Sequence, residues 1–363
     1  MIIIMKKKIL LQAYFHCNLG DDLLIKILCE RYPEAEFILI PPDNAPDSVE
    51  GISNLTVVKR NFIFKIKNKL LGMLFGKTVE MQLASKCDAS VLLGGSMFIE
   101  LQGRWKKILK RYSEICRVSK KYFVIGVNFG PYSSTEFYDS YVDFFSKTDS
   151  VVFRDNWSYE LFKGLPNVSV SSDVVMNLNI PKAEKKHQIV ISPIYLDDRV
   201  DLCGQCENYY RAVKDFCIKA AENGYIINIV SFCQEQNDYI AAQKIIDLTD
   251  ADTRKCISHT IYNGNISQIL QIFAESEVVV ATRFHAMILG FLSDSMVYPV
   301  IYSNKTRNVL SDIKFKGYST DIRSIENIEF DDVVNESNFC DISEIRKLAE
   351  SQFVAFDDFM AES

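Results

Sequence analysis

The chain has 363 residues, of which 48% are hydrophobic and 24% charged, and its formal net charge is −6. This length exceeds the usual size of one hydrophobic core, and the composition excludes general disorder, so we expect two folded domains. The acidic balance excludes a nucleic-acid binder that works through bulk positive charge. No stretch reaches the roughly 18 to 20 apolar residues that span a bilayer, so we expect a cytoplasmic protein.

Short apolar runs alternate with longer amphipathic segments along the chain, a pattern typical of repeated βα units with a parallel sheet. In the first half these runs predict strands at residues 8–15, 36–40, 55–59, 89–95, 121–129, 150–155 and 168–174. After a polar stretch the pattern restarts, with strands at 189–195, 225–232, 255–262, 278–284 and 297–303. The polar stretch, 179–188, therefore indicates a domain boundary.

The alternation in each half of the sequence predicts a Rossmann-like, doubly wound α/β domain. We place the N-terminal domain at 1–180 and the C-terminal domain at 186–335, and we expect a helix at 341–363 that is able to pack back on the first domain. Functional loops of such domains follow the strand ends, where helix N-termini offer N–H groups and positive potential. We therefore expect ligands in a cleft that the two domains face.

The ten cysteines are scattered along the chain. Thiols stay reduced inside the cell, so we expect most of them to be small core residues. The single C-x-x-C, formed by Cys203 and Cys206, lacks the second pair that a zinc site needs. We therefore predict no metal site.

Polar insertions follow many of the predicted strands. In chain order they hold Asn18-Leu19-Gly20-Asp21, Gly94-Gly95-Ser96, the segment 126–131, Arg154-Asp155 with Ser158, Asp173, Arg283-Phe284-His285-Ala286 and Tyr302-Ser303-Asn304-Lys305. Their order and content resemble the polysaccharide pyruvyl transferase family over residues 18 to about 310. The chain departs from that pattern at Ser96, where a third glycine is expected, and after Asp173, where the family often has a proline.

The resemblance implies two domains of the GT-B glycosyltransferase type. It also implies an enzyme that moves the pyruvyl group of phosphoenolpyruvate onto a sugar of a bacterial surface polysaccharide precursor as a cyclic ketal. Phosphoenolpyruvate would be the donor substrate, bound by the second domain, and no cofactor would be needed. The acceptor, expected to be a lipid-linked oligosaccharide of a capsule, exopolysaccharide or cell wall, would bind to the first domain.

Phosphoenolpyruvate carries a carboxylate and a phosphate around a reactive enol carbon, so its site needs several cations and a proton donor. The cations expected to bind it are Arg154, Arg283, Lys305 and Arg307. His285 is the expected proton donor. It would stand where a strand ends and a helix begins, beside Arg283, and both neighbours lower the pKa of an imidazole. A bound anion opposes that shift. Alternatively, His285 is a core histidine bonded to a backbone carbonyl.

The remaining candidates also have structural readings. Arg154 and Asp155 could form an ion pair at a helix start, with Asp155 capping the helix from Asn156 to Gly164. Asp173, a substrate-binding candidate through the resemblance, ends a predicted strand.

The loops of the first domain allow two readings as well. Asn18 and Asp21 either bind the acceptor, with Asp21 orienting a sugar hydroxyl, or form only a tight turn and cap. Gly94 and Gly95 either let a sugar approach the backbone or serve a turn that requires positive φ.

Two other functional classes compete with pyruvyl transfer. A nucleotide-sugar-dependent GT-B glycosyltransferase would need a carboxylate for the ribose and a glycine-rich diphosphate loop in the second domain, and this chain has no such loop after that domain's first strand. A non-catalytic binding protein on the same scaffold would not need Arg283, His285 and Lys305 together.

Two basic segments stand out in an acidic chain. Residues 59–77 contain six basic and no acidic residues among many apolar ones, and residues 103–121 contain eight basic residues and one glutamate. Such segments are able to lie in the interface of an anionic membrane, with Trp105 in the headgroup region. The alternative is that both are ordinary helices whose apolar faces pack on the sheet.

Overall fold

The computed structural model describes residues 6–42, 48–49, 51–199 and 201–362. The chain divides into two compact units. Unit 1 comprises Met1–Phe15, Asp21–Val174 and Arg346–Ser363, and unit 2 comprises His16–Gly20 and Val175–Ile345. A short segment of unit 2, His16–Gly20, therefore interrupts the first part of unit 1, and the C-terminal segment from Arg346 returns to unit 1 after unit 2.

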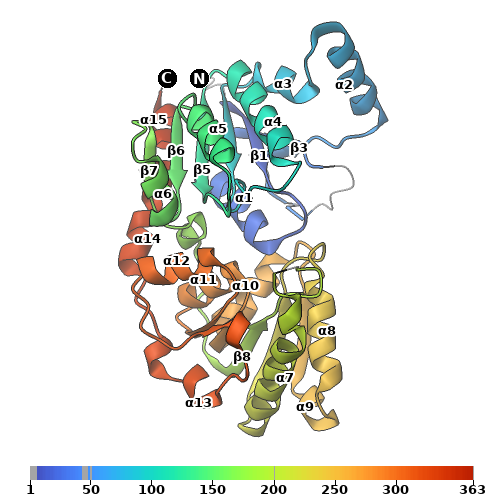
Figure 1. Cartoon of the computed structure of the whole chain (residues 1–363), viewed down its shortest axis with the longest axis vertical. Coiled ribbons are helices and arrows are strands. Elements are labelled where there is room, and N and C mark those ends of the chain that lie inside the picture. Colours follow the sequence, from blue (N-terminus) through green and yellow to red (C-terminus); the bar gives the residue numbers. More distant parts are fainter. Residues whose placement is uncertain (1–5, 43–47, 50, 200, 363) are drawn as a thin grey trace, which may run out of the picture. The chain divides into compact units, whose positions relative to one another are not determined.

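Unit 1 contains a seven-stranded parallel sheet in the order β3-β2-β1-β4-β5-β6-β7 (Figure 1). Its strands are β1 (Lys8–Ala13), β2 (Glu36–Leu39), β3 (Leu55–Val57), β4 (Ala89–Leu93), β5 (Tyr122–Val127), β6 (Ser150–Phe153) and β7 (Val168–Val170). Its helices include α1 (Leu19–Arg31), which begins in residues assigned to unit 2, α2 (Phe62–Phe75), α3 (Val79–Ala84), α4 (Trp105–Val118), α5 (Thr135–Phe145), α6 (Asn156–Phe162) and α15 (Val354–Ala361).

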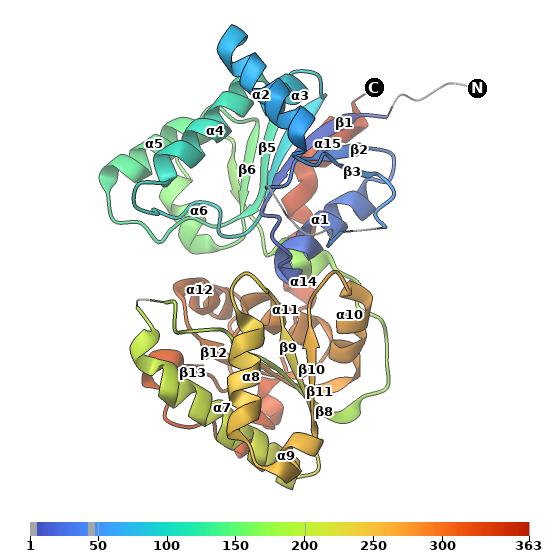
Figure 2. The ribbon, with the colours of Figure 1, turned by 90° about the vertical axis from the view of Figure 1, so that its right-hand side faces the viewer.

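Helices cover both faces of this sheet, so its strands read as continuous apolar runs (Figure 2). Successive residues of β5 point to opposite faces. The Tyr122 ring meets Phe144 of α5 at 6.0 Å between centroids, and the Phe123 ring meets Phe356 of α15 at 5.2 Å. The two faces thus form two apolar layers within unit 1.

Unit 2 contains a six-stranded parallel sheet in the order β10-β9-β8-β11-β12-β13. Its strands are β8 (Lys186–Ser192), β9 (Ile226–Ser231), β10 (Ile257–Ile261), β11 (Ser276–Ala281), β12 (Met296–Ile301) and β13 (Thr320–Asp321). Its helices include α7 (Cys206–Glu222), α8 (Asp238–Leu248), α9 (Ala251–Lys255), α10 (Ile266–Glu275), α11 (Phe284–Leu292), α12 (Asn304–Asp312) and α13 (Phe330–Val333).

Both sheets have the strand order of a Rossmann-like, doubly wound domain, which confirms the predicted fold class. All twelve predicted strands are present, most of them a few residues shorter than the apolar run. The strand predicted at 168–174 ends at Val170, and a 3₁₀ turn, Val174–Asn177, follows. The sequence pattern missed β13 because it has only two residues, which is too short for any periodicity.

The C-terminal segment forms two helices, α14 (Ser343–Ala349) and α15, joined by the 3₁₀ turn Glu350–Phe353, where the pattern predicted one helix. From Arg346 onward it belongs to unit 1. The buried side chain of Gln352 accepts a hydrogen bond from the N–H of Gly126 at 2.9 Å and donates one to the carbonyl of Ser172 at 2.7 Å. The segment therefore completes the hydrogen bonding of strand ends in unit 1.

The two basic segments differ in their packing. The apolar face of α4 is buried, and Trp105, Tyr112 and Ile115 lie in the core of unit 1. The prediction that Trp105 lies in a lipid headgroup region is therefore wrong, because only 7% of this residue is exposed. By contrast, none of the residues of α2 is buried. In the described part of the chain, no helix combines the length and apolar character needed to span a bilayer.

Candidate active site

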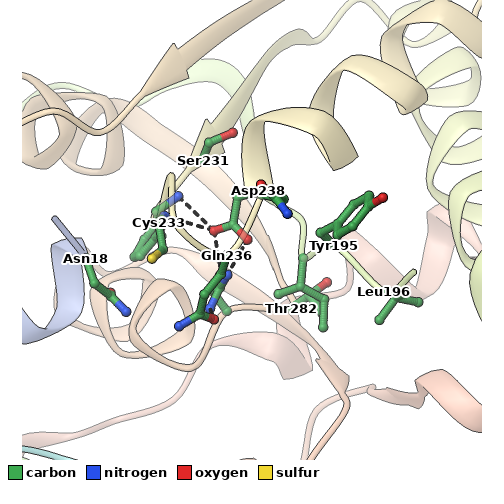
Figure 3. Close-up of polar contacts among 12 residues, drawn as sticks. Asn18, Tyr195, Leu196, Ser231, Cys233, Gln236, Asp238 and Thr282 are labelled. Atoms are coloured by element: carbon green, nitrogen blue, oxygen red, sulfur yellow. Dashed lines mark hydrogen bonds and ion pairs between the residues drawn. The ribbon is translucent and has the colours of Figure 1, made fainter. Parts of the chain in front are cut away.

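The predicted catalytic residues lie at the carboxyl edge of the unit 2 sheet. In the strand order β9-β8-β11-β12, the chain leaves β8 toward one side and returns to β11 on the other. Loops after such neighbouring strands diverge and leave room for a ligand, which is the usual binding place in a doubly wound domain. Figure 3 shows side chains from these loops, including Tyr195 after β8, Gln236 after β9 and Thr282 after β11.

Arg283 is held in a buried ion pair. Its Nε donates to Asp238 Oδ2 at 2.8 Å, its Nη2 pairs with Asp238 Oδ1, and its Nη1 donates to Gln236 at 2.6 Å. Asp238 begins α8 and also accepts the N–H groups of Phe232 and Cys233. Burial alone would lower the pKa of Arg283, but the facing Asp238 carboxylate raises it. Arg283 is therefore a fixed cation.

Three cations surround the buried phenol of Tyr302. Lys305 Nζ lies 5.4 Å and the Arg199 guanidinium carbon 5.3 Å from the centre of its ring. Burial alone would raise the pKa of Tyr302, but Lys305, Arg283 and Arg199 together lower it to about 8. Gln236 accepts hydrogen bonds from both arginines. We call Arg199, Arg283, Tyr302 and Lys305 the cationic cluster, and its positive potential suits an anion.

His285 lies in the first turn of α11, half-buried, with its ring edge-on to Phe284 at 5.1 Å between centroids. The backbone of Gly20 lies against this ring. A Cβ atom added to Gly20 would stand 1.7 Å from His285 Nδ1, so no side chain fits there. Both residues belong to unit 2. The predicted loop Asn18–Gly20 and the predicted general acid thus meet.

Asn18 holds this loop in place. It forms an isolated antiparallel bridge with Cys233 after β9, and its Oδ1 accepts the N–H of Gly20 at 3.2 Å. The next residue along, Leu19, donates its N–H to Phe232 at 3.0 Å. Asp21 lies in the first turn of α1 and is assigned to unit 1.

The structure separates two of the predicted cations. Lys305 and Arg307 are two residues apart on α12, so their side chains point in different directions. Arg307 is exposed and pairs with Asp321 at 2.5 Å, whereas Lys305 is half-buried and lies over the rings of Tyr302 and Phe284. Only Lys305 therefore joins the cationic cluster.

The predicted residues of unit 1 form a second group. Arg154 Nη1 pairs with Asp173 at 2.8 Å, both side chains are buried, and Arg154 Nη2 donates to Asn128 at 2.7 Å. A Cβ on Gly95 would stand 2.7 Å from Arg154, so the glycine is required for this close approach. Ser96, which replaces the third glycine, donates to the same Asn128 oxygen at 3.1 Å.

Two further candidates in unit 1 have structural roles. Asp155 caps α6, where its Oδ1 accepts the N–H of Ser158 at 2.8 Å and its Oδ2 accepts the Ser158 hydroxyl at 3.1 Å. This confirms the predicted cap. The atoms nearest to a Cβ on Gly94 belong to the Met97 side chain, at 2.9 Å, and the prediction that Gly94 and Gly95 serve a turn with positive φ is wrong, because neither adopts one.

The sequence pattern missed Arg199 and Asp238. Arg199 follows the predicted strand 189–195 and Asp238 follows the predicted strand 225–232, so the same rule that selected His285 would have included them. The loops that hold these two residues match none of the motifs in the resemblance. The strand-end position was the available signal, and for Asp238 also its place at the start of a helix.

The C-x-x-C pair lies where the 3₁₀ turn Cys203–Gln205 leads into α7, and the N–H of Cys203 donates to the carbonyl of Arg199 at 2.8 Å. Neither residue is in a disulfide, and burial raises the pKa of Cys206 to about 11. Within the described ranges, no three histidine, cysteine or acidic side chains come together as a metal site would require.

Comparison with solved structures supports the fold. The chain is similar to Staphylococcus aureus MnaA in its UDP complex, with a TM-score of 0.58, 13% identity and 99% of each chain covered. It is similar to a putative UDP-N-acetylglucosamine 2-epimerase of Listeria monocytogenes, with a TM-score of 0.56, 11% identity, and 97% of this chain and 94% of that chain covered. It is also similar to Anabaena Alr3699/HepE in complex with UDP and glucose, with a TM-score of 0.54, 13% identity, and 98% of this chain and 95% of that chain covered. These likenesses establish the GT-B fold.

Comparison of sequences establishes the family. The chain is 22% identical over 344 residues to the amylovoran biosynthesis protein AmsJ of Erwinia amylovora, a match that covers 84% of this chain and 81% of that protein. The family model named polysaccharide pyruvyl transferase matches residues 18–304. This range includes the loop at Asn18, the Arg154 loop, His285 and the cationic cluster up to Tyr302. The chain therefore belongs to the polysaccharide pyruvyl transferase family and is an enzyme of that family.

Proposed function

We propose that the enzyme transfers the pyruvyl group of phosphoenolpyruvate to a sugar of a bacterial surface polysaccharide precursor and forms a cyclic ketal. The observation that carries this proposal is the surplus of positive charge in the cationic cluster. Of these three cations, Arg283 bonds to a buried carboxylate, that of Asp238, whereas Arg199 contacts Gln236 and Lys305 lies over aromatic rings. A phosphate and a carboxylate on one small donor would balance this surplus.

Helix starts add to the attraction for an anion. Neither α11 nor α12 begins with a side-chain cap among the residues that the structure describes. Helix N-termini carry partial positive charge, and they bind phosphate and carboxylate groups readily. Lys305 lies in the first turn of α12, so its ammonium group and the helix start act on the same region. We assign the phosphate of the donor to this region.

His285 is the proposed general acid. Its half-buried ring is contacted by Gly20 and Phe284, which hold it at the start of α11. A protonated His285 would transfer its proton to the methylene carbon of phosphoenolpyruvate, which becomes the methyl group. The positive charge that develops at the enol carbon draws in one sugar hydroxyl, and its proton leaves toward a base. Phosphate then departs with the C–O bonding electrons, and a second sugar hydroxyl closes the ketal and gives its proton to the leaving phosphate.

Unit 1 is the proposed acceptor-binding unit. Gly94 and Gly95 follow β4 and Asp21 lies in the first turn of α1. β1 and β4 are neighbours in the sheet while the chain runs from β1 to β2 on the other side, so these loops border the place where a doubly wound domain binds ligands. Arg154 packs against Gly95 and so supports the loop after β4, and the ion pair with Asp173 holds Arg154 in place.

The proposal is tested by following phosphate and nucleotide release. The enzyme is incubated with phosphoenolpyruvate and a panel of lipid-linked sugar acceptors, and a parallel arm supplies UDP-sugars instead. Acceptor-dependent release of phosphate, together with a new ketal in the product, supports pyruvyl transfer. Release of UDP without phosphate would identify a GT-B glycosyltransferase, which shares the fold but is not favoured by the family match.

A further inference from the structure

Helix α2 exposes a continuous apolar stripe. Phe62 is 77% exposed, Met73 74% and Leu74 69%. At about 100° per residue these three side chains share one arc of about 120° with Ile63, Ile66 and Leu70. We call these six residues the exposed stripe. A soluble helix of a globular unit normally turns such a stripe toward the core, as α4 does.

The other side of α2 fixes the helix to unit 1. Phe64 packs on the core of unit 1, and Asn68 Oδ1 accepts the N–H of Val79 at 2.9 Å. Asn61 caps the start of the helix and Gly76, with φ of 60°, caps its end. The stripe is therefore presented outward by a helix that is anchored and capped. Figure 1 shows α2 at the margin of unit 1, beyond α3 and α4.

The charges around the stripe have one sign. Lys67 and Lys69 lie on its two edges, at about 20° outside the arc on either side, and residues 59–77 contain no acidic residue. Long lysine side chains can extend from such edges toward a polar surface while their stems stay in contact with apolar groups. This combination of an apolar stripe between two basic edges is typical of a helix that lies in the interface of an anionic bilayer.

A basic cavity lies beside the helix. It has a volume of about 350 Å³ and is lined by Arg60, before α2, and by residues of α2, α3 and α4, among them Lys107, Lys110, Arg111 and Glu114. Glu80, which also lines it, is bonded to Arg111 at both carboxylate oxygens. The Nε of Arg60 has no hydrogen-bond partner among the described residues. The cavity thus adds positive charge on the side of unit 1 that carries α2.

We propose that α2 docks unit 1 on an anionic membrane, with the exposed stripe in the boundary between headgroups and acyl chains and the basic residues among the headgroups. A second copy of this chain is a poorer occupant, because pairing two such helices would bring basic edges together without acidic partners. The membrane proposal does not depend on the identity of the donor, so it stands or fails separately from pyruvyl transfer.

The test compares matched variants of the full chain in vesicle co-sedimentation. The parent should bind vesicles of phosphatidylglycerol and phosphatidylcholine at low salt and dissociate as salt rises. Met73→Gln/Leu74→Gln should reduce the vesicle partition coefficient at least about tenfold, because glutamine keeps helix propensity and removes apolar surface. Leu248→Gln/Val354→Gln, exposed apolar residues elsewhere, is the control and should bind like the parent.

Insertion is read directly with a tryptophan within the stripe. In Phe62→Trp/Trp157→Phe, the remaining native Trp105 is buried, so brominated lipid should quench the new indole strongly. Lys67→Gln/Lys69→Gln should weaken binding to anionic vesicles, and Lys163→Gln/Lys255→Gln should not. Equal vesicle binding of the parent and Met73→Gln/Leu74→Gln, or no quenching, would overturn the proposal. A dimer in solution that the same two substitutions abolish would assign the stripe to a second copy and overturn it as well.

Discussion

Each unit holds a buried arginine paired with a buried aspartate at the carboxyl edge of its sheet. In unit 1, Arg154 faces Asp173 and the neutral Asn128, so the charges there balance. In unit 2, Arg283 faces Asp238, and Lys305 and Arg199 add positive charge around Tyr302. The comparison teaches that a buried arginine–aspartate pair by itself indicates a structural role. Further cations beside such a pair, without carboxylates to balance them, indicate a binding site for an anion.

The largest expected effect concerns His285. His285→Gln should lower turnover by about 10² to 10⁴-fold, because a general acid commonly contributes that much. His187→Gln, an exposed histidine of unit 2, is the control. Acceptor-dependent phosphate release and the melting temperature are measured together. Normal turnover of His285→Gln would remove the proton-donor role, and a large fall in melting temperature would instead indicate a core histidine.

The two pairs can be compared directly by truncating their arginines. Arg154→Ala and Arg283→Ala should each lower the free energy of unfolding by about 3 to 5 kcal/mol, because each leaves a buried carboxylate without its partner. Urea unfolding gives this value, with Lys163→Ala as a surface control. Phosphoenolpyruvate should raise the melting temperature of Arg154→Ala but not that of Arg283→Ala. Loss of this protection in both variants would make Arg154 a donor ligand too, as the sequence motif predicts.

The contact between Gly20 and His285 is tested by adding one methyl group. Gly20→Ala should displace the imidazole and lower turnover by about 10²-fold, since a misplacement of about 1 Å at a catalytic group costs that much. Gly164→Ala is the matched control, because a Cβ there meets nothing within 4 Å. If Gly20→Ala keeps full turnover, the position of the His285 ring is not critical.

Substitution of Lys305 tests the surplus of positive charge in the cationic cluster, and it should destabilise the fold less than truncation of Arg283. Lys305→Gln should weaken binding of phosphoenolpyruvate by about 10 to 100-fold, which corresponds to a charge-assisted contact of about 1.5 to 3 kcal/mol. Calorimetric titration measures it, and Lys186→Gln, paired with Glu275 at the sheet's other end, is the control. Arg307→Gln should have a smaller effect, because this cation is exposed and paired with Asp321. Unchanged affinity in Lys305→Gln would place the donor elsewhere.

The smallest effect is a shift in a titration. The pKa of Tyr302 is lowered to about 8, so its tyrosinate should form before that of any exposed tyrosine. Since the folded pKa lies below the usual value of about 10, this group adds to the free energy of unfolding as pH rises from about 8 to 10. The contribution is lost as pH falls through 8. Near-UV absorbance follows the tyrosinate, and Tyr302→Phe should remove the early component.

The same titration reports on the donor. A bound anion offsets the cations, so phosphoenolpyruvate should raise the pKa of Tyr302 toward its usual value. Tyr318→Phe, an exposed tyrosine, should leave the early component in place. A titration that the donor does not move would separate the cationic cluster from the donor site.

The sequence predicted most of the fold because parallel strands buried on both faces leave continuous apolar runs. It also placed His285 and Arg283 correctly at a strand end. It could not separate Lys305 from Arg307, because only the direction of each side chain on α12 distinguishes a residue of the cluster from a surface ion pair. It could not distinguish α2 from α4 either, since both have basic and apolar residues and only the packing shows which apolar face is covered.

The partners of Arg283 and Arg154 were beyond the sequence pattern for a different reason. Asp238 lies 45 positions before Arg283 and Asp173 lies 19 positions after Arg154. Such pairings depend on which strands become neighbours in the sheet. The assignment of Asn18 and Gly20 to unit 2 depends in the same way on tertiary contacts, namely the bridge to Cys233 and the contact with His285.

The exchange of segments between the two units has a consequence for synthesis on the ribosome. Domains commonly fold in the order in which they emerge, N-terminal first. Here Gln352 supplies hydrogen bonds to the buried backbone of Gly126 and Ser172, and Phe356 covers Phe123. These positions of unit 1 have no such partners until residues 352–356 have left the exit tunnel. We therefore expect unit 2 to become protease-resistant before unit 1, although most of unit 1 is translated earlier.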